Sequence, residues 1–176
     1  MIIKRTEILL SLLAISYGED DNFEFNLWKA DTLVFNFKES INDFKGFDII
    51  VGNPPYVCSR RLSDEARTNM QKWSVCRTGH PDLYIPFFQI AVENLKDNGI
   101  MGYITMNSFI KSLNGRALRD YFKHKSNRIR IIDFRSKKVF EKKSTYTCIC
   151  FVTNQESSCI EYAVDENASL DASIRF

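Results

Sequence analysis

Glycine, proline and histidine are scarce in this 176-residue sequence, which contains seven, four and two of them. So few glycines and prolines exclude a long flexible linker or a low-complexity segment, and no segment repeats at a fixed period. With 44% hydrophobic residues, the chain can bury one sizeable core but not two. We therefore expect one compact domain over residues 1–165, followed by a short acidic tail over residues 166–176.

Cysteine pairs and long apolar runs are also missing. The five cysteines form no C-x-x-C pair, so we expect reduced thiols and no bound metal. Lys4 and Arg5, followed by the apolar residues 8–15, resemble a signal peptide, but Glu7 interrupts the pattern. The run is also far shorter than the ~20 residues that cross a bilayer. We expect an amphipathic or buried helix, no membrane contact and a cytoplasmic protein.

Basic charge is concentrated in the middle of the chain. Residues 56–143 contain 18 basic and 8 acidic side chains, a net charge of +10, whereas residues 1–55 and 144–176 each have a net charge of −4. Such a block attracts phosphates, and it can equally be a solvated surface. From charge alone, both interpretations stay open.

Apolar runs and turn residues alternate as in an α/β sheet. We expect strands over residues 23–28, 47–51, 100–105, 128–134 and 145–152. Helices are expected over residues 83–96, with Asp82 as N-cap, and from Asn107 or Ser108 to His124. This alternation favours a parallel sheet with right-handed crossovers, in which the last strands pair antiparallel.

Two polar residues follow predicted strands. Asp31 comes after the first strand, and Asn53 comes directly after residues 47–51, a continuous apolar run typical of a strand buried on both faces. Because ligands of open α/β sheets bind outside the carboxyl ends of the strands, both side chains are expected to face one crevice. From spacing alone, a turn at a strand end explains Asp31 better.

The run Asn53-Pro54-Pro55-Tyr56 indicates the clearest chemistry. The prolines lack amide hydrogens and fix φ, so the loop is stiff and its carbonyls remain free acceptors. The side-chain carbonyl of Asn53 and the backbone carbonyl of Pro54 can accept both hydrogens of an exocyclic amino group, beside the flat Tyr56 ring. These bonds favour a pyramidal nitrogen whose lone pair faces an electrophilic methyl group, without a strong general base. An ordinary two-proline turn is the alternative, but this run directly after an apolar strand is much more specific.

Residues 47–57 resemble the motif region of N6-adenine DNA methyltransferases of restriction-modification systems. Residues 82–84, 95–99, 103–105, 139–143 and 145–152 resemble later segments of that family, so the resemblance covers roughly residues 6–165. It implies a partial Rossmann-like, S-adenosylmethionine-dependent methyltransferase fold, mostly parallel with antiparallel last strands. It also implies methyl transfer from S-adenosylmethionine to an adenine that flips out of DNA.

The resemblance also assigns roles to single residues. It implies that Asn53 and Pro54 hold the amine, and that Tyr56 and Phe140 sandwich the adenine. Asp31, Asn53 and Pro55 would border the cofactor. Without the resemblance, Phe140 as a core aromatic residue and Asp31 as a turn residue are adequate interpretations.

The sequence departs from the family pattern at the cofactor, because no two glycines stand at G-x-G spacing. We therefore expect a truncated gene, a split subunit or an expressed fragment, with a second chain that would supply the cofactor loop or a target-recognition domain. Three alternatives stay open: an RNA adenine substrate, protein-glutamine N5 methylation, and a noncatalytic DNA-binding or assembly fragment. The basic block favours a nucleic acid over an acceptor peptide.

Overall fold

The computed structural model describes residues 2–19, 25–135 and 146–165, and the chain divides into the units Met1–Phe35 and Asn36–Phe176. The first unit contains α1 (Ile2–Ser16), which confirms the predicted first helix, and Gly18, with a φ of +85°, follows two residues after its end. The strand expected over residues 23–28 is wrong for residues 25–28, the part that is described, because the described residues of this unit include no strand with which their backbone could pair. Among the described residues, no helix is long and apolar enough to cross a membrane.

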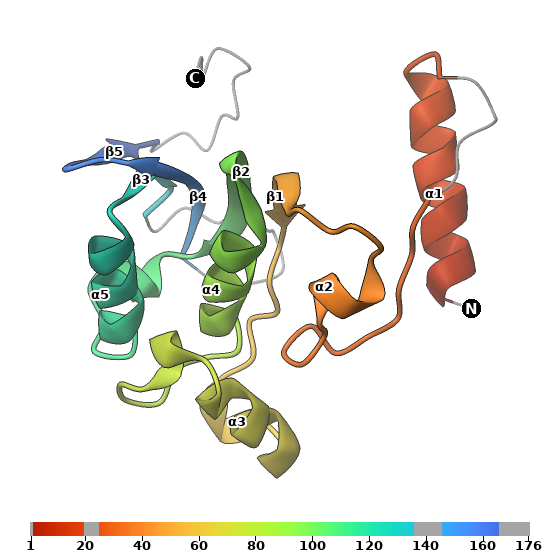
Figure 1. Cartoon of the computed structure of the whole chain (residues 1–176). Helices are drawn as coiled ribbons and strands as arrows, with labels where there is room; N and C mark the ends of the chain where they lie inside the picture. The colour runs from red at the N-terminus through yellow and green to blue at the C-terminus, as the bar shows by residue number, and fades with distance from the viewer. Residues whose placement is uncertain (1, 20–24, 136–145, 166–176) are drawn as a thin grey trace. The chain divides into compact units, whose positions relative to one another are not determined.

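The second unit contains all five strands of the described chain (Figure 1). Its elements are α2 (Phe37–Ser40), β1 (Phe47–Gly52), η1 (Ser59–Arg61), α3 (Asp64–Gln71), η2 (Ser74–Cys76), α4 (Ile85–Asn94), β2 (Leu95–Met106), η3 (Asn107–Ile110), α5 (Arg116–Lys125), β3 (Asn127–Asp133), β4 (Thr147–Glu156) and β5 (Ile160–Val164). Four of the expected strands are therefore confirmed, and β5 was not predicted.

The strands form one sheet in the order β1-β2-β4-β3-β5. β1 pairs parallel with β2, and β3 pairs parallel with β5, whereas β4 is antiparallel to both of its neighbours. Four strands therefore run in one direction and β4 alone opposes them. This confirms the predicted α/β fold with antiparallel pairing among its last strands.

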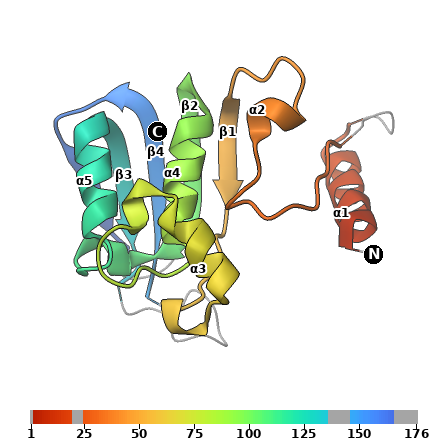
Figure 2. The same ribbon diagram turned by 60° about the horizontal axis from the view of Figure 1, so that its bottom comes forward.

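Both long helices of the second unit cover the same face of the sheet (Figure 2). Tyr103, Cys150 and Ile131 are register partners across β2, β4 and β3, so their side chains share a face. The Phe88 ring of α4 packs on Tyr103 and on Phe122 of α5, each at a centroid distance of 5.7 Å. The core therefore lies between this face and the two helices.

β1 is not buried on both faces as predicted. It is the edge strand, and Ile49 and Val51 are 65% and 75% exposed. Gly52 points toward Tyr103 and hence toward the α4 face, so the alternation of side chains along a strand turns Ile49 and Val51 to the opposite face. The prediction failed because a sequence run shows apolar character but not the position of a strand in its sheet.

The predicted helix beginnings were also wrong. α4 begins at Ile85 with Tyr84 at the N-cap position, and the Asp82 carboxylate instead accepts a hydrogen bond from the Ser59 amide. The helix expected from Asn107 is a short 3₁₀ turn, and α5 starts only after Gly115. The intervening turn closes so tightly that a Cβ on Gly115 would lie 2.2 Å from the carbonyl oxygen of Phe109.

Candidate active site at the carboxyl edge of the sheet

Three polar residues lie where parallel strands end. Asn53 follows β1, Asn107 follows β2, and Asp133 is the last residue of β3. Because these three strands run in the same direction, their carboxyl ends meet at one edge of the sheet. This edge is the candidate site.

The loop after β1 presents two unused acceptors. The Asn53 side chain is exposed, and within the described part of the chain neither it nor the Pro54 carbonyl has a hydrogen-bond partner. The following residues are fixed, because the Val57 amide donates to the Pro55 carbonyl at 3.1 Å and the Leu83 amide donates to the Val57 carbonyl at 2.9 Å. The loop is thus anchored just after the two unused acceptors, of which the Asn53 side chain is exposed and the Pro54 carbonyl belongs to a buried residue.

Tyr56 is held at its hydroxyl. Its O–H donates to the Ile104 carbonyl on β2 at 3.0 Å, and its ring meets Tyr84 edge to face, with centroids 6.4 Å apart and an interplanar angle of 85°. Burial raises the pKa of Tyr56 to about 12, so the hydroxyl remains a donor at neutral pH. The ring orientation is therefore set by β2 and α4.

Asp133 organises the end of β3, and the sequence interpretation missed it. Its carboxylate accepts hydrogen bonds from the Asn107 side chain at 2.8 Å, from the Arg135 amide at 2.9 Å and from the Tyr162 hydroxyl. Burial by itself would raise the pKa of this carboxyl, but the bonds from Tyr162 and Asn107 hold the pKa below its usual value. The sequence could have indicated it, since Asp133 is the second-last residue of the predicted strand 128–134, much as Asn53 follows another predicted strand.

For two predicted site residues, the structure gives no position relative to this edge of the sheet. Asp31 belongs to the first unit, where its carboxylate accepts the Leu33 amide at 3.0 Å and its carbonyl accepts the Val34 amide at 3.1 Å. These bonds are those of a turn residue. Phe140 falls outside the described residues. The cofactor role of Asp31 and the base-stacking role of Phe140 stay predictions.

The sequence model of the Eco57I restriction-modification methylase family matches residues 6–140. This chain belongs to that family. Among its relatives, Type II methyltransferase M.BstVI of Geobacillus stearothermophilus is 33% identical over 122 residues, which are 69% of this chain and 20% of that protein. The Type II restriction enzyme and methyltransferase RM.Eco57I of Escherichia coli is 33% identical over 124 residues, which are 66% of this chain and 12% of that protein. The chain thus spans a fifth or less of the length of these relatives.

Solved structures show the same fold. The Type IIL restriction-modification enzyme MmeI, in a complex with DNA, matches 88% of this chain and 22% of its own, with a TM-score of 0.63 and 12% identity. A methyltransferase subunit of a type I restriction-modification system from Streptococcus thermophilus matches 86% of this chain and 32% of its own, with a TM-score of 0.58 and 18% identity. The restriction-modification family and the methyltransferase fold predicted from the sequence are thus confirmed.

Proposed function

We propose that this methylase chain carries the amine-binding part of a DNA adenine-N6 methyltransferase. The exposed Asn53 carboxamide beside the Pro54 carbonyl, at the carboxyl end of β1, is the observation that carries the proposal. Two acceptors on a stiff loop match the two hydrogens of one exocyclic amino group. Asn53 and Pro54 would hold this amine so that its lone pair faces the methyl donor.

The Tyr56 ring would support the flipped base. Its hydroxyl bond to the Ile104 carbonyl and its contact with Tyr84 keep the ring fixed before a base arrives. A base must leave the duplex to reach such a loop, and an aromatic surface offsets part of the lost stacking. Phe140 would cover the other side of the adenine.

S-adenosylmethionine would supply the electrophilic methyl group. The residues present fit its reacting end, because Asn53 and Pro55 are both exposed beside the proposed amine site. Asp31 would meet its adenine, as the family resemblance implies. We further propose that residues 1–165 form part of a catalytic domain whose glycine-rich loop comes from a polypeptide segment outside this sequence, for example a second chain.

Basic residues beside the loop support a nucleic-acid substrate. Arg60 and Arg61 of η1 are exposed within a few residues of Tyr56. Both can neutralise phosphates that flank a flipped nucleotide. The DNA complexes among structures of this fold agree with that substrate.

The identity of the methylated product tests this proposal. The chain is mixed with a fragment of M.BstVI taken from outside the region matched here, with S-adenosylmethionine, and with either DNA, RNA or a glutamine-containing peptide. We expect N6-methyladenine in DNA, detected by mass spectrometry of the nucleosides. Methylcytosine, methylated RNA alone or N5-methylglutamine would each refute the assignment of the substrate.

A further inference from the structure

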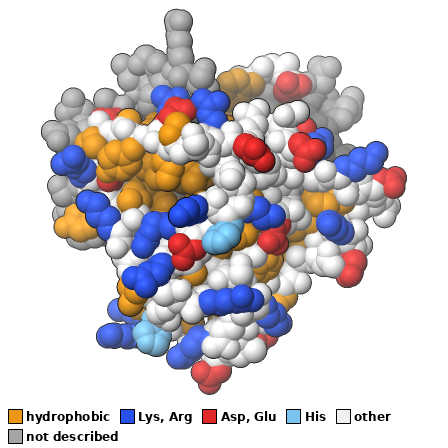
Figure 3. All heavy atoms as spheres, turned by 60° about the vertical axis from the view of Figure 1, so that its left-hand side comes forward, with side chains coloured by type: hydrophobic (Ala, Val, Ile, Leu, Met, Phe, Trp, Pro, Cys, Tyr) orange, Lys and Arg blue, Asp and Glu red, His pale blue; other side chains and the backbone are white. Residues whose placement is uncertain are grey.

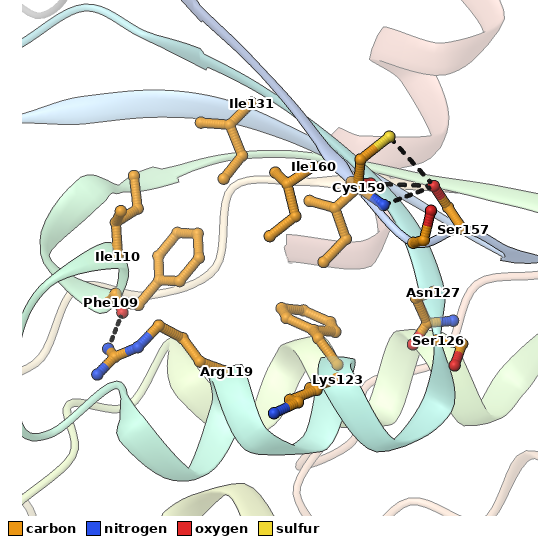
Figure 4. A pocket seen from close by; sticks show the side chains of 13 residues that line it. Phe109, Ile110, Arg119, Lys123, Ser126, Asn127, Ile131, Ser157, Cys159 and Ile160 are labelled. Atoms are coloured by element: carbon orange, nitrogen blue, oxygen red, sulfur yellow. Dashed lines mark hydrogen bonds between the residues drawn. The ribbon is translucent and has the colours of Figure 1, made fainter.

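A second concave surface lies away from the Asn53 loop, between α5 and the strands β3 and β5. It encloses a cavity of about 460 Å³ (Figure 4). Ile131 and Ile160 reach into it from the strands, across from Arg119 and Lys123 of α5. The cavity is lined by Phe109, Ile110, Arg119, Phe122, Lys123, Ser126, Asn127, Ile129, Ile131, Ser157, Ser158, Cys159 and Ile160. Among the described residues, the lining therefore contains two cations and no acidic side chain.

The helical layer on this face of the sheet is too narrow for five strands. Packed helices lie about 8–10 Å apart and strands about 4.8 Å apart, so one helix covers roughly two strands. In the described residues, α4 and α5 are the two long helices on this face, and they cover about four strands by this measure. The strand that is left uncovered is β5, where the side chains of Ile160, Tyr162 and Val164 are 59%, 49% and 36% exposed.

These three residues of β5 face the same side as the helices. Ile160 and Tyr162 are register partners of Ile129 and Ile131, which point toward α5. The cavity and the outer part of β5 thus form one apolar groove beside α5. In Figure 3, hydrophobic side chains gather in a patch that Lys and Arg side chains border.

Two of the three basic residues that α5 places beside this groove are available to a partner. Arg116, Arg119 and Lys123 follow helical spacing and share one side of α5. Arg116 and Lys123 are exposed and have no ion pair within the described residues. Arg119 is fixed by donating to the carbonyls of Phe109 at 2.6 Å and Ser112 at 2.9 Å.

We propose that this groove, the α5–β5 groove, binds an amphipathic helix of a partner polypeptide. Its apolar face would fill the cavity, and Asp or Glu residues along its flank would pair with Arg116 and Lys123. A helix fits because it would extend the layer of α4 and α5 by one member and cover the exposed apolar residues of β5. DNA fits less well, since a phosphate gains nothing from an apolar cavity and would lose hydration there.

Two native cysteines allow a direct test. Cys159 lines the cavity and is exposed, and Cys58 is exposed next to the Asn53-to-Tyr56 loop, whereas the other three cysteines are buried. The probe is a synthetic helical peptide of ~18 residues, with leucines at i, i+3 and i+7 and glutamates on the flank. Alkylation of each cysteine by iodoacetamide is followed by mass spectrometry while the peptide is titrated.

We expect the peptide to slow alkylation of Cys159 roughly tenfold at a concentration ten times its Kd, and to leave Cys58 unchanged. A peptide with lysines in place of glutamates, and one with a central proline, should protect Cys159 much less. Equal protection by the lysine peptide, or none by any of the three, would overturn the proposal. If the proline peptide protects Cys159 as well as the helical peptide does, the bound segment is an extended strand that pairs with β5 and not a helix, and the proposal is overturned.

Variants of groove residues test whether the peptide binds in the α5–β5 groove. Ile160→Asp and Lys123→Glu should each weaken the protection of Cys159 at least about fivefold, whereas Lys125→Glu, on the same helix but outside the cavity, should change it less than about twofold. Circular dichroism confirms that each variant is folded, and the exposed Lys123 provides a test even if Ile160→Asp is unstable. A duplex oligonucleotide that protects Cys159 in place of the peptide would refute the proposal, whereas protection of Cys58 by DNA concerns only the proposed methyltransferase site.

Discussion

Tyr56 combines a fixed hydroxyl with a ring beside the proposed amine site. The O–H bond to the Ile104 carbonyl is internal to the protein, so the hydroxyl contributes to the position of the ring and not to the contact with a base. The ring and the hydroxyl can therefore be tested separately. Loss of the hydroxyl should change the stability of the protein, whereas loss of the ring should also change the binding of a base.

Tyr56→Phe should lower the free energy of unfolding by about 1 kcal/mol, because it removes one hydrogen bond and keeps the ring. Tyr56→Ala should in addition weaken binding of an adenine-containing single-stranded oligonucleotide by about 1–3 kcal/mol, the usual contribution of base–aromatic stacking. Urea unfolding and fluorescence anisotropy measure the two quantities. Equal binding by Tyr56→Ala and Tyr56→Phe would contradict a stacking role.

Asp133 should make stability depend on acid pH. Its pKa is lower in the folded protein than the ordinary value of 3.8, so the folded state gains stability above that value and loses it as the pH falls through the folded pKa. Asp133→Asn should therefore cost about 1–3 kcal/mol in urea unfolding at pH 7, and the difference from wild type should shrink as the pH falls below 3.8. Asp97→Asn, at an exposed position, is the control. A cost that is the same at both pH values would contradict an ionised, hydrogen-bonded carboxylate.

At the scale of elements, the beginning of α5 depends on close contact between Gly115 and η3. A Cβ at Gly115 would lie 2.2 Å from the Phe109 oxygen, which is backbone and cannot swing aside, whereas a Cβ at Gly102 would meet the Phe151 side chain at 3.2 Å. Gly115→Ala should therefore destabilise the protein by about 1–3 kcal/mol or more, and Gly102→Ala by less. Thermal unfolding followed by circular dichroism compares the two. A Gly115→Ala variant as stable as wild type would show that this turn is not tightly packed.

Element types were easier to predict than element boundaries and burial. The apolar runs at residues 47–51 and 100–105 form strands because short apolar segments between helices pair readily in a sheet. The start of α5 was not predictable, since it depends on contact of Gly115 with Phe109. The exposure of Val51 follows from the edge position of β1, and β5 pairs only with a strand some 30 residues earlier in the chain. Helix starts, side-chain exposure and strand pairing of this kind depend on tertiary contacts and not on the local sequence pattern.

At the scale of the whole molecule, the open edge of the sheet bears on association. Ile49 and Val51 are apolar and exposed on β1, and an uncovered edge strand favours pairing with other chains. We expect the 20.5 kDa chain to self-associate in analytical ultracentrifugation, and the double variant Ile49→Lys, Val51→Lys to sediment as a monomer. Leu113→Lys, at a position 58% exposed, should change nothing. A wild-type chain that is monomeric at all concentrations would contradict this expectation.

The structure gives the positions of some predicted site residues, whose roles stay predictions. The Asn53 loop and Tyr56 lie at the predicted carboxyl end of a strand, because residue order alone places them there. The Asp133 cluster was missed, since its members come from three segments that only the sheet brings together. Asp31 makes the bonds of a turn, and its role toward a cofactor is a matter for experiment.

Dependence of methyl transfer on Asn53 is the most direct test of the proposed site. Transfer of radiolabelled methyl from S-adenosylmethionine to DNA is measured for the chain together with the M.BstVI fragment, using wild type, Asn53→Ala and the control Asn98→Ala, which alters another exposed asparagine at the opposite end of β2. Our account predicts a loss of about 100-fold or more for Asn53→Ala and little change for Asn98→Ala, with both variants folded. Transfer that is equal in Asn53→Ala and wild type would contradict it.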